Sequence, residues 1–263
     1  MGHVRDSMRR ELHSWWSPAA ERTLRIVVYG HWGIPILMFP TAMADALEYE
    51  RFGLVEVLRG WLESGRCKLY CVDSLNAESW LAPPEVPPAV RSQRHRAYNR
   101  YITEEVVPFI YADCRGRQPI LTAGASFGAY HAANLFFRRP DLFVGVIAMS
   151  GEYNLLAYTG GYMDEECYFN SPVHYLANLD DSVWLPLLRS RPQQYFASGQ
   201  GAYERPEATL ELSRVLSSKA IPHVAELWGA EWAHDWPTWR AMMPVYLERV
   251  LSAEPLLFSM VAR

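Results

Sequence analysis

The sequence has few cysteines, and they show no spacing typical of a metal site. The four cysteines, at positions 67, 71, 114 and 167, form no C-x-x-C pair. Four are also too few to cross-link a chain of 263 residues with disulfides. No H-E-x-x-H or comparable ligand pair is present. The stretch at 199–201 (GQG) lacks the third glycine of a dinucleotide-binding loop. We therefore expect reduced thiols, no metal and no cofactor.

Long hydrophobic runs and an excess of basic charge are missing as well. One of the longest apolar runs, residues 144–149 (VGVIAM), is far shorter than the ~20 residues that span a bilayer. The basic N-terminal residues are not followed by the apolar stretch of a secretory signal. A net charge of -4 provides no basic field to attract nucleic acid. We expect a cytoplasmic protein without nucleic-acid or membrane partners, and homo-oligomerisation is left open.

What the sequence does contain is an alternation of strand-like and helix-like segments from about residue 24 onward. This alternation predicts a single α/β domain over residues 1–263, with a mostly parallel central sheet and helices on both faces. Residues 24–29 and 36–39 are expected to be two strands of a hairpin, because only a short turn separates them. Residues 52–63 are expected to form one helix. Residues 152–192, here called the insert, interrupt the alternation and are expected to cover one end of the sheet, over the active site.

The pentapeptide GASFG at residues 124–128 matches G-x-S-x-G between a predicted strand (119–123) and a predicted helix (127–138). In this position the motif is typical of a nucleophile elbow, a sharp turn that raises a serine hydroxyl above the edge of the sheet. Both flanking positions are glycine because side chains there would collide where strand and helix pass. Ser126 is therefore the candidate nucleophile. The Phe127 N–H, at the start of the helix, is a candidate donor to a substrate oxyanion.

A serine nucleophile requires a base, since its hydroxyl is barely ionised at neutral pH. In this motif the base follows the serine in the chain, which leaves four histidines. His131 falls inside the helix after the elbow, His174 in the insert, and His223 at the start of the last predicted strand. His234 alone lies in a loop after that strand, where the base is presented, and it is the candidate base.

The acid is expected in the loop at residues 198–205 (SGQGAYER), after the strand at 194–197. Glu204 is the first carboxylate there and is the candidate acid, although a charge at the start of a helix is an alternative role for it. Weaker candidates by position are Asp180, Asp181 and Glu207. Asp235 is expected to cap the last helix.

A second oxyanion donor is expected in the loop at residues 40–45 (PTAMAD), which follows the strand ending at Phe39. The backbone N–H of either Thr41 or Ala42 is suitable, and the sequence does not distinguish them.

The chain resembles the putative-esterase (esterase D-like) branch of the α/β-hydrolases, which includes S-formylglutathione hydrolases, feruloyl and siderophore esterases and mycolyltransferases. The resemblance runs from about Ile26 to Leu251. Its most specific parts are the elbow AGASFGAYHAAN and the stretch HDWPTWR, supported by ILMFPTAMADALEYERFG, LYCVDSLNAESW, SGQGAYE and IPHVAELWG. It implies the α/β-hydrolase fold, with Ser126, His234 and Glu204 as nucleophile, base and acid. Relatives commonly have glycines where this chain has Ala42-Met43-Ala44.

These residues predict hydrolysis of a small-molecule carboxylic ester through an acyl-enzyme. A thioesterase or acyltransferase would use the same residues, and a binding protein that has lost turnover would share the fold. Five aromatic residues of the insert are expected either to form the wall of an acyl pocket or to pack the insert against the body: Tyr158, Tyr162, Tyr168, Phe169 and Trp184.

Overall fold

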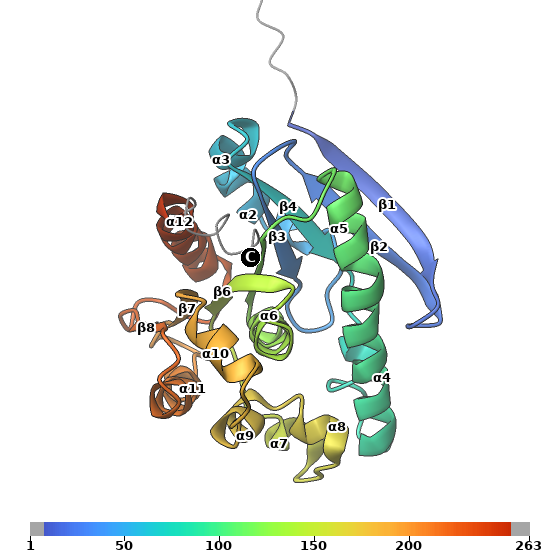
Figure 1. Cartoon of the computed structure of the whole chain (residues 1–263), viewed down its shortest axis with the longest axis vertical. Coiled ribbons are helices and arrows are strands. Elements are labelled where there is room, and N and C mark those ends of the chain that lie inside the picture. Colours follow the sequence, from blue (N-terminus) through green and yellow to red (C-terminus); the bar gives the residue numbers. More distant parts are fainter. Residues whose placement is uncertain (1–7, 254–263) are drawn as a thin grey trace, which may run out of the picture.

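The computed structural model describes residues 8–253, which fold around one eight-stranded sheet (Figure 1). The strand order is β1-β2-β4-β3-β5-β6-β7-β8, and the pairs from β4–β3 to β7–β8 are parallel. This confirms the predicted mostly parallel α/β sheet. The strands are β1 (Arg10–Ser17), β2 (Arg22–Tyr29), β3 (Ile34–Phe39), β4 (Cys67–Val72), β5 (Ile120–Ala125), β6 (Phe143–Met149), β7 (Gln193–Ser198) and β8 (Val224–Leu227).

The predicted hairpin of residues 24–29 and 36–39 is wrong. Strand β2 pairs antiparallel with β1 and with β4, so β4 lies between β2 and β3. Strand β1, with its alternating exposure, was missed and provides the hairpin partner of β2. Strand β3 is buried at every position, which suits a strand that has parallel neighbours on both sides and helices on both faces.

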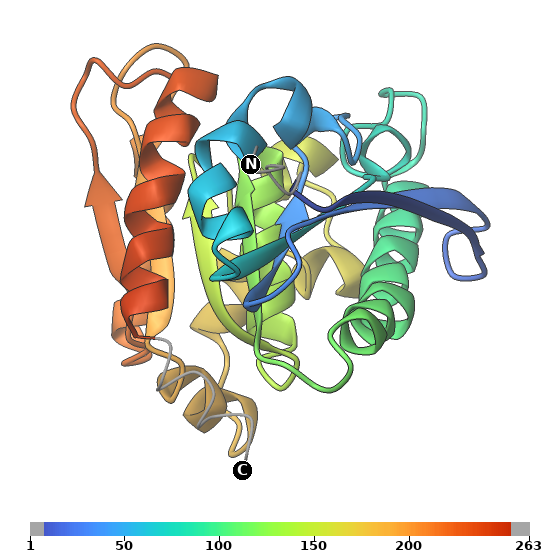
Figure 2. The ribbon, with the colours of Figure 1, turned by 90° about the horizontal axis from the view of Figure 1, so that it is seen from above.

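Helices pack on both faces of the sheet. Figure 1 shows α4 and α5 to one side of the strands and α3 and α12 to the other, and Figure 2 shows the same layers from above. The longer helices are α4 (Pro88–Arg100), α5 (Val107–Asp113), α6 (Phe127–Arg138), α11 (Pro206–Ser218) and α12 (Trp236–Ser252). The short ones are α1 (Glu48–Arg51), α2 (Leu54–Val57), α3 (Arg59–Glu63), α7 (Leu156–Thr159), α8 (Glu165–Tyr168), α9 (Pro172–Ala177), α10 (Trp184–Arg189) and the 3-10 turn η1 (Asn76–Glu78).

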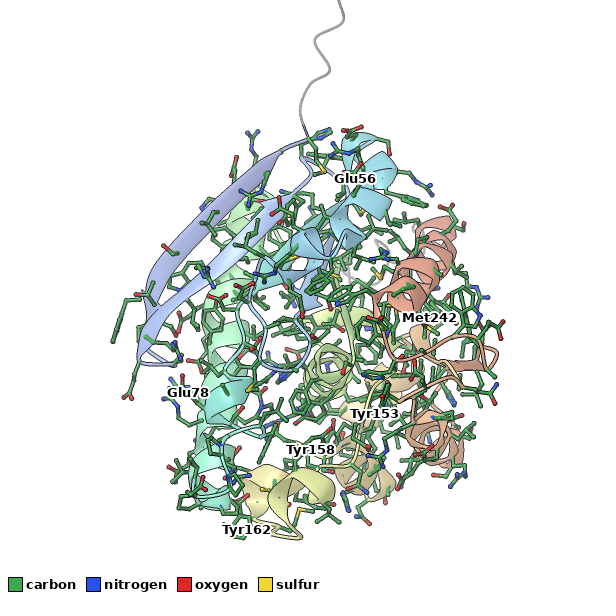
Figure 3. The ribbon with its side chains drawn as sticks, turned by 180° about the vertical axis from the view of Figure 1, so that it is seen from behind. Glu56, Glu78, Tyr153, Tyr158, Tyr162 and Met242 are labelled. Atoms are coloured by element: carbon green, nitrogen blue, oxygen red, sulfur yellow. The ribbon has the colours of Figure 1, made fainter. Side chains whose placement is uncertain are left out.

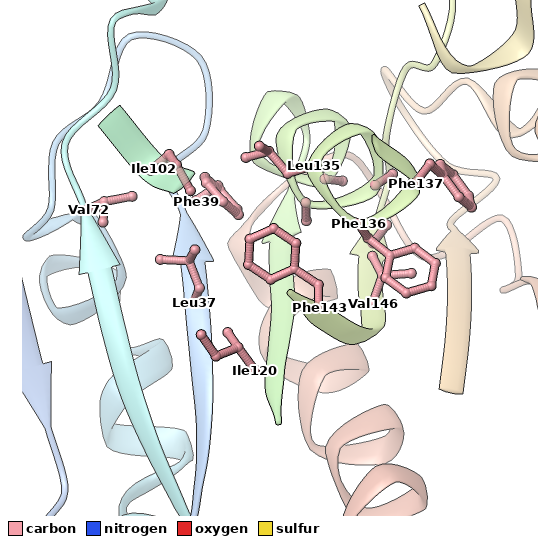
Figure 4. Packing of buried hydrophobic residues seen from close by; sticks show 14 of the residues in the cluster. Leu37, Phe39, Val72, Ile102, Ile120, Leu135, Phe136, Phe137, Phe143 and Val146 are labelled. Atoms are coloured by element: carbon pink, nitrogen blue, oxygen red, sulfur yellow. The ribbon is translucent and has the colours of Figure 1, made fainter. Parts of the chain in front are cut away.

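Two hydrophobic layers hold the helices to the sheet. On one face, Leu37 and Phe39 of β3 pack with Leu135 and Phe136 of α6 in a fully buried cluster (Figure 4). On the other face, the strands pack against α1–α3 and α12. Helical spacing places the apolar residues at 239, 243, 246, 247 and 250 on one face of α12, and this apolar stripe is buried. Burial of both faces of the central strands makes β5 a rigid support for the residue that follows it.

Two predicted helices differ in detail. Residues 52–63 are broken into α2 and α3, preceded by Gly53 at a left-handed φ of 78°. The spacing of apolar residues predicts a helix over 98–111, but the helix begins ten residues earlier, at Pro88, and passes through a π-helical stretch, η2 (Tyr101–Val106), before α5. Pro108, the second residue of α5, has no N–H to donate to the carbonyl four residues earlier, which lies within this stretch.

The insert contains the four short helices α7–α10. They are joined by turns, and α7 ends at Gly160, which has a left-handed φ of 62°. Within residues 8–253 we find no helix with the length and apolar character needed to cross a membrane.

Candidate active site

Ser126 lies in a strained turn between β5 and α6. Its φ is 54° and its ψ is -124°, a conformation that non-glycine residues rarely adopt outside functional sites. The Ser126 N–H donates to the Met149 carbonyl at 2.8 Å. A Cβ on Gly128 would lie 2.1 Å from the Phe39 oxygen, and one on Gly124 would lie 2.4 Å from the Gly128 carbonyl carbon. Only glycine permits this close approach, so the local sequence dictates the turn.

His234 joins the serine to a buried acid. It lies in the loop between β8 and α12, and its Nε2 is 2.8 Å from the Ser126 Oγ. Its Nδ1 is 3.4 Å from Oε2 of Glu204, whose side chain is only 1% exposed. The residues proposed from sequence as nucleophile, base and acid are thus brought together from three loops that lie far apart in the chain.

Several donors hold the Glu204 carboxylate. The Ser150 hydroxyl donates to Oε1 at 2.6 Å, and the Ser198 hydroxyl donates to Oε2 at 3.1 Å. Burial raises the pKa of Glu204, but hydrogen bonds from His234, Ser150 and Ser198 outweigh it, so the net shift is downward. The carboxylate is therefore ionised and able to stabilise positive charge on an adjacent imidazole.

The loops of the acid and the base are packed backbone to backbone. The His234 N–H donates to the Ala202 carbonyl at 2.9 Å, and the Gly201 N–H donates to the Trp232 carbonyl at 2.9 Å. A Cβ on Gly199 would lie 2.0 Å from that same carbonyl oxygen. The glycines of SGQGAYE therefore allow the two loops to meet.

The other histidines that follow Ser126 have different partners. His131 is buried and its Nε2 is 2.6 Å from Asn76 Oδ1. The His174 Nδ1 is paired with the Ser171 hydroxyl, and the His223 Nε2 with the Ser213 hydroxyl. In the part of the chain that the structure describes, none of these rings has a hydrogen bond to Ser126.

The alternative acids also act elsewhere. Asp181 accepts from the N–H groups of Val183 and Trp184 at the start of α10. Asp235 accepts from the Trp236 N–H and is the N-cap of α12. Glu207 pairs with Arg205 at 3.2 Å. For Asp180 no hydrogen bond or ion pair is found among residues 8–253.

The two backbone groups proposed for the second oxyanion donor have different surroundings. The Thr41 N–H donates to Glu48 Oε2 at 2.8 Å. Ala42 is exposed, and within the described chain its N–H has no hydrogen-bond partner. Phe127 is the first residue of α6, so its N–H has no acceptor within the helix.

An aromatic residue of the insert, Tyr158, packs next to the elbow. The Tyr158 ring lies 5.3 Å from the Phe127 ring in an edge-to-face contact. Figure 3 shows Tyr158 directed into the molecule, whereas Tyr162 lies at the outer edge of the insert. Tyr168 and Phe169 contact each other, with ring centroids 5.0 Å apart. Tyr158 is therefore the insert aromatic that packs against Phe127, the residue after the nucleophile.

A cavity of about 720 Å³ lies at the opposite end of the sheet and is distinct from this site. Its lining includes Gly33, Arg66 and Gln118, which precede β3, β4 and β5, whereas Ser126 follows the carboxyl end of β5. The acid within it, Asp113, is paired with Arg9 and Lys68. Among residues 8–253, no group of three or more His, Cys, Asp and Glu side chains is arranged to hold a metal ion.

A protein-family model matches most of the chain. The family model described as putative esterase matches residues 73–255, more than half of the chain. No curated protein sequence matches the chain.

Solved esterases share the fold. A ferulic acid esterase superposes with a TM-score of 0.71 at 16% identity, over 96% of this chain and 99% of that one. An S-formylglutathione hydrolase from Agrobacterium tumefaciens gives a TM-score of 0.73 at 14% identity, over 93% and 95%. The S-formylglutathione hydrolase from Staphylococcus aureus gives a TM-score of 0.66 at 15% identity, over 95% of this chain and 96% of that one. The chain therefore belongs to the putative esterase family and is a carboxylesterase with the α/β-hydrolase fold.

Proposed function

We propose that the protein hydrolyses a small carboxylic ester through an acyl-enzyme formed on Ser126, with His234 as general base and Glu204 as the acid that orients it. The observation that carries this proposal is the pair of contacts at His234: Nε2 to the serine oxygen at 2.8 Å and Nδ1 to the buried carboxylate at 3.4 Å. A hydroxyl with a base in hydrogen-bond reach, itself oriented by a third group, is the arrangement that activates serine.

In the first half-reaction, the Ser126 Oγ attacks the ester carbonyl carbon and its proton passes to His234 Nε2. The carbonyl oxygen becomes an oxyanion, which accepts hydrogen bonds from the Phe127 N–H and from the loop at 40–45. The ionised Glu204 accepts the Nδ1–H bond and stabilises the imidazolium. When the tetrahedral intermediate collapses, the ester C–O bond breaks and the departing alcohol takes the proton from Nε2.

In the second half-reaction, water replaces the alcohol. His234 takes a proton from the water as the water oxygen attacks the acyl carbon, and the same N–H groups hold the new oxyanion. Collapse breaks the bond to Ser126, which regains its proton from His234, and the carboxylic acid leaves. Transfer to another alcohol, or cleavage of a thioester, would use the same residues and differ in the acceptor or the leaving group.

The test is the reaction of Ser126 with a fluorophosphonate probe, combined with turnover of aryl esters of increasing acyl length. We expect labelling and turnover in the wild type and neither in Ser126→Ala, because loss of the nucleophile costs several orders of magnitude in rate. A feruloyl ester and S-formylglutathione belong in the same panel, since the structural neighbours are named for them. Comparable aryl acetate turnover by a folded Ser126→Ala variant would refute the proposal.

A further inference from the structure

The loop at residues 40–45 is held at its start against the elbow. Strands β3 and β5 are parallel neighbours with Phe39 beside Gly124. The Tyr49 hydroxyl, which is buried, donates to the Phe39 carbonyl at 2.6 Å and accepts from the Ala125 N–H at 3.2 Å. The chain therefore leaves β3 at a defined place next to Ser126.

Glu48 holds the next residue of the loop with both of its oxygens. Oε2 accepts the Thr41 N–H at 2.8 Å and Oε1 accepts the Thr41 hydroxyl at 2.6 Å. The Glu48 side chain is buried in α1. Because the Thr41 N–H is directed at this carboxyl group, it is not available to a substrate oxygen.

Asn76 holds the following peptide group. Its Nδ2 donates to the Ala42 carbonyl, and its Oδ1 faces His131 Nε2 at 2.6 Å. Since the Ala42 carbonyl accepts only from a donor, the Asn76 amide is oriented with Nδ2 toward the loop, and Nε2 of His131 carries the proton that Oδ1 accepts. Both Asn76 and His131 are buried, so these bonds are shielded from water.

Glu48 and Asn76 hold the peptide groups on either side of the Ala42 N–H. The Ala42 N–H belongs to the Thr41–Ala42 peptide, the preceding peptide is fixed through the Thr41 N–H, and the following one through the Ala42 carbonyl. His131 also lies on α6, the helix that begins with Phe127. One helix thus supports both candidate oxyanion donors, the Phe127 N–H directly and the Ala42 N–H through His131 and Asn76.

We propose that Glu48 and Asn76 are positioning residues that direct the Ala42 N–H, and not the Thr41 N–H, toward the substrate oxyanion. The inference rests on the proposed acyl-enzyme function and goes beyond it, because it assigns the donor and the two side chains that direct it. Anchoring by side chains explains how a loop without glycine, with Ala42-Met43-Ala44 after Thr41, can present a backbone donor of fixed direction.

The experiment compares kcat and KM for an aryl acetate in matched variants that are shown to be folded by circular dichroism and thermal unfolding. Glu48→Ala removes both acceptors, and Glu48→Met removes them while filling the space. Asn76→Asp keeps the shape but replaces the donor facing the Ala42 carbonyl with a carboxylate oxygen. We expect kcat to fall about 10- to 100-fold in each, less than the loss of an entire donor, since the N–H is misdirected and not removed.

KM should change little, because an oxyanion donor acts mainly in the transition state. Glu48→Gln should restore most of kcat, since its carbonyl can accept the Thr41 N–H and its amide can donate to the Thr41 hydroxyl. The controls are Glu56→Ala, on the surface in α2 (Figure 3), and Asn178→Asp in the insert; both should stay within about twofold of wild type.

The inference is overturned if the folded Glu48→Met and Asn76→Asp variants keep kcat within about twofold of wild type, or if only KM changes. Glu48→Met keeps the test informative where Glu48→Ala does not fold. Failure here is distinguishable from failure of the proposed function: an active Ser126→Ala refutes the acyl-enzyme, whereas an inactive Ser126→Ala beside fully active Glu48 and Asn76 variants refutes only the positioning role.

Discussion

The Ser150 hydroxyl donates a 2.6 Å hydrogen bond to Oε1 of Glu204, although the two residues lie 54 positions apart. Ser150 directly follows β6 and adopts a left-handed φ of 54°. Its hydroxyl also accepts from the Trp239 indole N–H at 3.1 Å. The Ser150 N–H donates to the Ala197 carbonyl of β7 at 2.7 Å, and Trp239 belongs to α12. The residue that fixes the second carboxylate oxygen is therefore itself held by β7 and α12. Because the carboxylate is held in place, the role of Glu204 can be tested by a substitution that keeps the size of its side chain.

Glu204→Gln should lower kcat by about 10²- to 10⁴-fold with a much smaller change in KM. Glutamine keeps the size of the side chain but removes the charge that stabilises an imidazolium. Steady-state kinetics on an aryl ester measures this. The controls Asp181→Asn and Asp235→Asn should stay within about tenfold of wild type, because asparagine is also a good helix cap. If kcat falls further in either control than in Glu204→Gln, that residue and not Glu204 is the acid.

His234→Ala should be nearly inactive, whereas His223→Ala and His174→Ala should keep most of their turnover. Only the His234 ring is within hydrogen-bond reach of the Ser126 oxygen in the described structure. Initial rates for the wild type and the three variants provide the measurement. Activity retained by His234→Ala but lost in His223→Ala would reassign the base.

Gly128→Ala should destabilise the fold and reduce turnover, while Gly60→Ala should do neither. An added Cβ at position 128 meets the Phe39 backbone oxygen at 2.1 Å, so the strand or the elbow has to move, at a cost of about 1–3 kcal/mol or more. Gly60 is inside α3 with nothing within 4 Å of its added Cβ, and alanine there should stabilise by up to about 1 kcal/mol. Urea unfolding compares the two, and equal stability would contradict the close approach.

Acid should destabilise the wild type more steeply than His131→Gln. Burial lowers the pKa of His131 from 6.5 to about 3, so below pH 6.5 the unfolded chain binds a proton that the folded chain does not. The free energy of unfolding contributed by this residue therefore falls as the pH drops from 6.5 toward 3, by up to about 1.4 kcal/mol per pH unit.

Buried His95, whose pKa is also lowered by burial, contributes in the same direction and is unchanged in the variant. Urea unfolding between about pH 6.5 and pH 4.5 isolates the difference between wild type and His131→Gln. Parallel stability profiles for the two proteins would show that the His131 ring is not held neutral.

The elbow and the last helix could be predicted from sequence because local spacing specifies them. Gly124 is required by its close approach to Gly128 within a single strand–turn–helix unit, and Gly128 by its close approach to the end of β3. The stripe at 239, 243, 246, 247 and 250 appears directly in the order of residues. The positions of His234 and Glu204 were predictable for a related reason, since each lies in a loop that follows a recognisable strand.

Strand order and the supporting side chains were decided by tertiary structure. Whether β2 pairs with β3 or with β4 depends on which edges meet in space, and a short connecting turn does not reveal this. Ser150, Glu48 and Asn76 are ordinary polar residues in the sequence, and their roles arise only where distant segments converge on one carboxylate or one loop. The sequence by itself determined the chemistry that the chain carries, whereas long-range packing decided how its acid and its oxyanion loop are held.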